Sequence, residues 1–169
     1  MIKRVLFFVI LLALATTPAH AAQQCYSLTE LKAEQLIRLH SELMVITVTC
    51  HQSSQGDNLV PFYTGFTQRN LKKLHNAEQT LIHHYKICYG GSGIDQLDKL
   101  RTRLGNEYGQ KIADQSAPLF CTLWRDKVIQ MYGATPEQVD AEVQSLMKTG
   151  SPYERMCQPS GAPLASKGQ

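Results

Sequence analysis

The stretch SLTELKAEQLIRLHSELMVITVTC (residues 27–50) decides the fold class of this chain. Apolar side chains recur along it at alternating steps of three and four residues, at Leu36, Leu39, Leu43, Ile46 and Cys50. This is the spacing of one helix face. Ser27 is followed three residues later by Glu30, which is the pattern of a capping box. The β-branched end, MVITVTC (44–50), would favour a strand in isolation, but the longer apolar stripe predicts one continuous helix.

Four more helices are expected after this one. The five predicted helices cover about 27–50, 61–88, 94–116, 118–132 and 135–149. Glycines in YGGSG (89–93) are typical of a helix end, and Pro136 is suited to a first helical turn. The sequence therefore predicts an all-α domain, an up-down bundle of about five helices linked by disulfides.

The N-terminus has the pattern of a secretory signal. Two basic residues, Lys3 and Arg4, precede the apolar run VLFFVILLALA (5–15) and the small-residue site AHA (19–21). The apolar run is too short to span a membrane as a helix. We therefore expect residues 1–21 to be removed on export.

The mature chain is expected to be a periplasmic or secreted protein without a stable membrane span. The residues directly before Cys25 are Ala22-Gln23-Gln24, which suit a lipoprotein peptidase badly, so a lipid anchor is disfavoured. We expect one helical domain over residues 22–157 and a disordered tail over 158–169, which is rich in small and polar residues.

The charge balance gives no indication of a nucleic-acid partner. The full chain has 17 basic and 14 acidic residues, and Lys3 and Arg4 leave with the signal, so the mature chain has 15 against 14. Nucleic-acid binding would call for a clustered basic patch. The nearest basic segment, RNLKKLH (69–75), has the spacing of a solvated helix face.

Five cysteines remain after the signal, and in an exported protein they predict disulfides. They lie 25 to 38 residues apart, so the close pairs of redox, haem and zinc motifs are absent. In an up-down bundle, Cys50 ends the first helix where Cys121 begins the fourth, so these two should pair. Cys25 should pair with either Cys88 or Cys157. One cysteine is then left over, and it could join two chains.

Two groups of side chains could carry chemistry. His84 and Cys88 lie four residues apart on one predicted helix face, a spacing that would suit a thiol enzyme or redox protein. However, Cys88 falls at a helix C-terminus, where the helix dipole disfavours a thiolate. His75 and His83 could hold a metal ion, although no metal-binding motif surrounds them. We expect no catalytic residue, metal ligand or cofactor, and keep both groups as alternatives.

Four stretches resemble a group of small exported helical proteins of proteobacteria. They are LHSELMVITVTC (39–50), YTGFTQRN (63–70), LDKLRTRLGNEYGQK (97–111) and LFC (119–121), and the likeness spans about residues 36–121. The resemblance implies export, a helical fold and a Cys50–Cys121 pair, and it implies no mechanism. The expected role is therefore non-enzymatic: binding of a partner protein or an envelope component.

Overall fold

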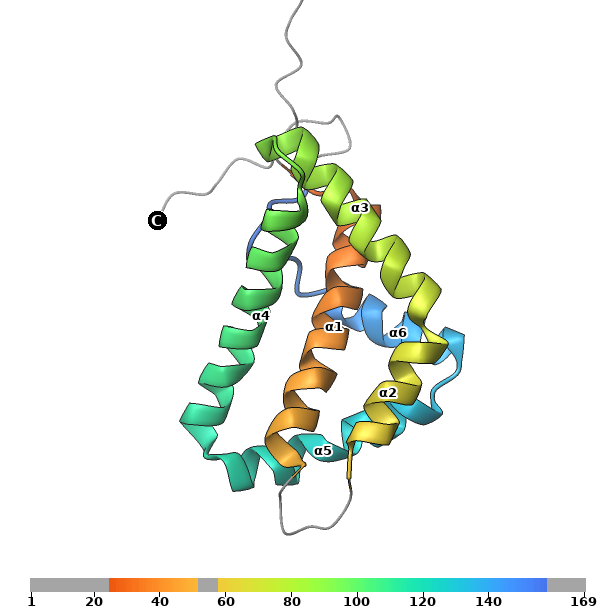
Figure 1. Ribbon diagram of the computed structural model, residues 1–169, viewed down its shortest axis with the longest axis vertical. Coiled ribbons are helices and arrows are strands. Elements are labelled where there is room, and N and C mark those ends of the chain that lie inside the picture. Colours follow the sequence, from red (N-terminus) through yellow and green to blue (C-terminus); the bar gives the residue numbers. More distant parts are fainter. Residues whose placement is uncertain (1–24, 52–57, 158–169) are drawn as a thin grey trace, which may run out of the picture.

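The computed structural model describes residues 25–51 and 58–157, and the described chain is all-α. Its six helices are α1 (Leu28–Cys50), α2 (Val60–Arg69), α3 (Leu71–Tyr89), α4 (Ile94–Gln115), α5 (Ala117–Gly133) and α6 (Pro136–Met147) (Figure 1). The predicted signal (1–21) and the predicted tail (158–169) lie outside the described residues. No helix in the described ranges is both long and apolar enough to cross a membrane.

Helix α1 is the centre of the structure and packs against all five other helices. The predicted apolar stripe is buried along its whole length, at Leu36, Leu39, Leu43, Ile46 and Cys50. The predicted capping box is present as well: the Ser27 hydroxyl accepts from the Glu30 amide at 3.3 Å, and the Ser27 amide donates to the Glu30 carboxylate at 2.6 Å. The periodicity of residues 27–50 therefore predicted both the helix and its buried face.

The described chain has six helices instead of five because Asn70 divides the predicted second helix into α2 and α3. The backbone of Asn70 leaves the helical region, with φ −100° and ψ 9°. Its buried side-chain amide donates to the Phe66 carbonyl at 2.9 Å, which lets a side chain compete with the backbone for a helical acceptor. The break lets α2 lie against α5 while α3 packs along α1.

Two disulfides join parts of the chain that are distant in sequence. Cys50 is bonded to Cys121, the pair expected from the bundle topology, with 5.5 Å between the Cα atoms. Cys25 is bonded to Cys157, one of its two expected partners, with 5.1 Å between the Cα atoms. The Cys157 end is held by a short parallel bridge, in which the Tyr26 amide donates to Arg155 and its carbonyl accepts from Cys157. Cys88 lies outside both disulfides.

Candidate functional site: a histidine and a thiol beside the Cys25–Cys157 disulfide

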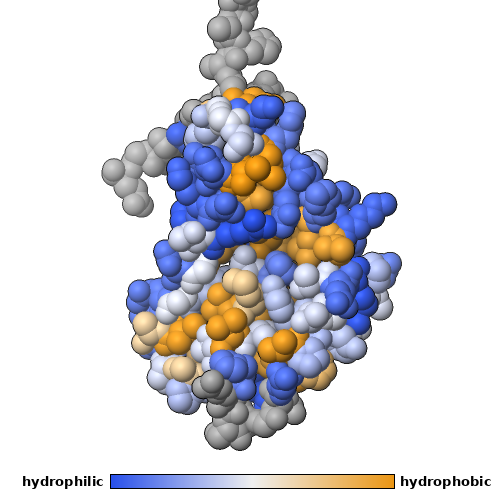
Figure 2. Space-filling view, in the orientation of Figure 1, coloured by the Kyte–Doolittle hydropathy of each residue, from blue (hydrophilic) through white to orange (hydrophobic). Residues whose placement is uncertain are grey.

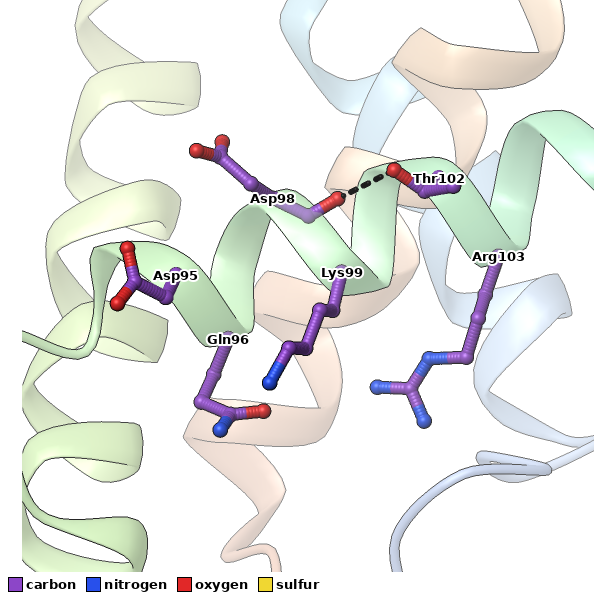
Figure 3. A pocket seen from close by; sticks show the side chains of 6 residues that line it. All are labelled: Asp95, Gln96, Asp98, Lys99, Thr102 and Arg103. Carbon is purple, nitrogen blue, oxygen red and sulfur yellow. Dashed lines mark hydrogen bonds between the residues drawn. The ribbon is translucent and has the colours of Figure 1, made fainter.

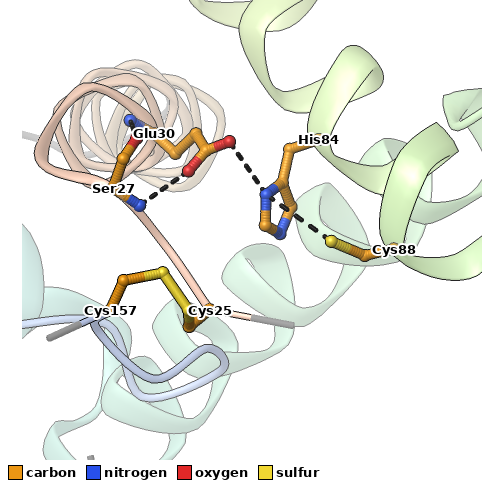
Figure 4. Close-up of a disulfide and its surroundings, with 6 residues drawn as sticks. All are labelled: Cys25, Ser27, Glu30, His84, Cys88 and Cys157. Carbon is orange, nitrogen blue, oxygen red and sulfur yellow. Dashed lines mark hydrogen bonds and ion pairs between the residues drawn. A yellow bond between two sulfur atoms is a disulfide. The ribbon is translucent and has the colours of Figure 1, made fainter. Parts of the chain in front are cut away.

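The first candidate pair from the sequence does come together. His84 and Cys88 lie one turn apart on α3, with 3.8 Å between the Cys88 sulfur and Nδ1 of the histidine. Glu30, from the first turn of α1, lies 2.9 Å from the same Nδ1. Figure 4 shows these three side chains near the Cys25–Cys157 disulfide. A carboxylate, an imidazole and a thiol are therefore grouped at one end of the bundle.

The geometry around His84 does not form a catalytic relay. In such a relay, the nucleophile and the carboxylate contact different nitrogens of the imidazole, so that a proton can pass through the ring. Here Glu30 and Cys88 both approach Nδ1. The opposite nitrogen, Nε2, is buried and has no hydrogen-bond partner among the described residues. The thiol and the carboxylate thus compete for one position.

The surroundings of Cys88 also disfavour a thiolate. Burial raises the pKa of the Cys88 thiol, and the nearby carboxylates Glu30 and Glu154 raise it further. The thiol lies in the last turn of α3, where the negative end of the helix dipole acts in the same direction. A reactive cysteine needs the opposite environment, with positive charge and a lowered pKa.

The histidine is held mainly by packing. Its side chain is only 3% exposed, and the edge of its ring meets the Tyr26 ring with 4.8 Å between centroids. Tyr26 in turn shares a 2.7 Å hydrogen bond with the hydroxyl of buried Tyr85. His84 is therefore a core side chain whose polar contacts, to Glu30 and Cys88, are both made through Nδ1.

Helix α1 also carries a stripe of charged side chains that was not predicted from the sequence. Glu34, Arg38 and Glu42 recur every four residues, which resembles a solvated face, yet all three are buried. Arg38 donates both of its Nη1 hydrogen bonds to the Glu107 carboxylate, at 2.9 and 2.7 Å. Glu42 accepts from Lys127 at 2.8 Å. Only the fold brings these partners together, because they lie 69 and 85 residues apart in sequence.

Glu34 is the most deeply placed member of this stripe. Burial raises the pKa of its carboxyl group, and a 2.8 Å hydrogen bond from the Ser151 hydroxyl and the charge of Arg38 only partly oppose that effect. The Ser151 contact fastens the segment after α6 to α1. This stripe therefore serves to join α1 to its neighbours.

The second candidate pair does not come together. His75 and His83 are both exposed on α3, eight residues apart, which is about 12 Å along a helix. Two ligands at that distance cannot share one ion. Within the described residues, no group of three or more His, Cys, Asp or Glu side chains could hold a metal ion.

Comparisons with known proteins add no family to this chain. No protein-family model matches it. No curated protein and no solved structure matches it significantly.

Proposed function

We propose that the protein is an exported, non-enzymatic protein of the bacterial envelope that binds a partner protein. Export is supported by the signal pattern of residues 1–21 and by the two disulfides, which form and persist in oxidising compartments. Mass spectrometry of the protein from an extracytoplasmic fraction should find a chain that begins at Ala22 and carries both disulfides. A chain that keeps residues 1–21, or one in which the four disulfide cysteines are reduced, would contradict export.

The observation that carries the binding proposal is a change of exposure along one face of α1. Ala33 and Ile37 are buried on this face. Further along the same face, Met44 is 42% exposed and Val48 is 63% exposed. In Figure 1, α3 and α4 diverge from their common corner, and the C-terminal half of α1 lies between α4 on one side and α2 on the other; this separation of the helix backbones in front of α1 is called the gap below. Figure 2 shows apolar surface in the same region.

The α4 edge of this gap suits a close approach. Arg101 of α4 pairs with Glu78 of α3. Gly105 and Gly109 continue the Arg101 side of α4 at steps of four residues, and a Cβ added to either would meet no atom within 4 Å. The two glycines would let an amphipathic helix that covers Met44 and Val48 come close to the backbone of α4, and helix docking of this kind is a common mode of peptide recognition. The proposed occupant is an apolar helix face of a partner protein.

Site-specific photocrosslinking in the cell tests this proposal. A crosslinking residue at position 48 should give one adduct of defined mass with an envelope protein, and the second change Met44→Asp should abolish it. The matched control places the same residue at Lys72, which is exposed in the first turn of α3. Circular dichroism checks that the Met44→Asp variant remains folded.

Three outcomes would overturn the proposal. They are the absence of an adduct at position 48, the same adducts from both positions, and an adduct only with a second copy of this chain, which would mean self-association.

A further inference from the structure

An open cavity of about 530 Å³, lined by residues of α4 alone, lies on a different side of that helix from the gap described above. It is lined by Asp95, Gln96, Asp98, Lys99, Thr102 and Arg103. Figure 3 shows that the side chains of Gln96, Lys99 and Arg103 project together to one side of the helix, whereas Asp95 and Asp98 project from other parts of it. The side with the three projecting chains thus collects two positive charges and one amide.

Two carboxylates, Asp95 and Asp98, line the cavity together with these two positive charges. Neither Lys99 nor Arg103 forms an ion pair with a described residue, and the nearby Asp98 carboxylate is bound by Arg101 at 3.4 Å. Like charges four residues apart on a helix repel each other. An anion placed between Lys99 and Arg103 would relieve that repulsion.

Arg103 is held in position before any ligand arrives. Its guanidinium lies over the Tyr153 ring, 4.6 Å from the centroid. The Tyr153 hydroxyl donates to Glu107 at 3.0 Å, and Glu107 is fixed in turn by Arg38. A guanidinium held over an aromatic ring can still use the N–H donors along its edge, and these bind a planar or tetrahedral oxyanion through two parallel hydrogen bonds. Positioning of this kind lowers the entropic cost of binding.

We propose that this side of α4 binds a phosphate group carried by a small molecule or a lipid. Arg103 supplies the two-pronged contact, Lys99 the second charge, and the Gln96 amide a neutral donor. Two cations match the charge of a phosphomonoester better than that of a single carboxylate. Asp95, which has no basic partner in the described chain, marks the acidic boundary of the site and excludes a second anionic group there. The proposal is independent of the apolar gap over α1.

Binding is tested on the full mature chain at low ionic strength with three probes: glycerol phosphate by calorimetry, phosphatidylcholine vesicles containing phosphatidic acid, and pure phosphatidylcholine vesicles. Lys99→Gln should weaken binding at least tenfold. Arg103→Lys keeps the positive charge but loses the pair of parallel N–H donors, so it should weaken binding less than Arg103→Gln. Asp95→Asn should strengthen binding. The control Lys72→Gln removes an equal charge from α3 and should leave binding unchanged, and thermal denaturation checks that each variant is folded.

The probes separate the two sources of the phosphate. Saturable binding of glycerol phosphate supports a small-molecule ligand, and binding only to vesicles with phosphatidic acid supports a lipid headgroup. No binding to either probe overturns the proposal. Equal losses in Lys99→Gln and Lys72→Gln would also overturn it, because they would show attraction by net charge without a site.

Discussion

The corner between α3 and α4 allows a sharp test of how tightly the bundle is closed. Gly93 precedes α4 with a φ of +76°, and an added Cβ would overlap the carbonyl oxygen of Ile82 and lie 3.1 Å from the amide nitrogen of Lys86. The left-handed conformation costs a non-glycine residue about 1–2 kcal/mol. The overlap with α3 backbone adds about 1–3 kcal/mol, because a backbone cannot turn away as a side chain can. Gly93→Ala should therefore lower the free energy of unfolding by about 3 kcal/mol.

Gly91→Ala is the matched control. Gly91 has a similar φ of +67°, but an added Cβ would meet nothing within 4 Å. It should cost only the conformational part, about 1–2 kcal/mol. Urea denaturation with the disulfides intact measures both variants, and the difference between them isolates the contact with α3. Equal losses in the two variants would refute a close approach of Gly93 to α3.

Three further predictions concern single side chains and one disulfide. Burial, with a contribution from the charge of Arg101, lowers the pKa of His40 to about 4, from an ordinary value of about 6.5. Between pH 4 and pH 6.5 the folded state therefore binds fewer protons than the unfolded state. The contribution of His40 to the free energy of unfolding is complete above pH 6.5 and falls by up to about 3 kcal/mol toward pH 4. His40→Gln should flatten this part of the pH profile in urea titrations, and an unchanged profile would count against the shift. Replacing both Cys50 and Cys121 by alanine opens a loop of 71 residues and should cost about 4 kcal/mol by the chain-entropy relation; a loss below about 1 kcal/mol in calorimetry would contradict it. Because its pKa is raised, the Cys88 thiol should react with iodoacetamide at pH 7.5 more slowly than glutathione does, and a faster reaction would show an activated thiol.

The features that the sequence could predict are those with short-range signals. The stripe from Leu36 to Cys50 repeats within one helix, and the capping box at Ser27 needs only three residues. The Cys50–Cys121 pair follows from topology, because helices that alternate in direction bring their ends together. The choice of Cys157 over Cys88 for Cys25 could not be made in that way, since the segment after α6 could have reached either end of the bundle.

The features that the sequence could not predict depend on distant partners. Nothing in the sequence around Asn70 sets it apart from other helical asparagines, whereas in the fold its side chain is buried and bonded to the Phe66 carbonyl at the end of α2. Glu34 and Arg38 have the spacing of a solvated face until the segment after α6 and helix α4 cover them. Periodicity identifies a helix, but it does not show which of its polar faces will be covered.

The placement of the disulfides complements these buried charges. Removing Glu34, Arg38 and Glu42 from water costs free energy that their partners only partly return, so α1 gains less from burial than an apolar helix would. Each end of α1 is tied covalently, through Cys25 just before it and Cys50 at its last residue. Two disulfides at the ends of one central helix reduce the number of conformations open to the unfolded chain. They also hold the exposed side of α1 in place, so the partner proposed above would meet a surface that was already ordered by folding.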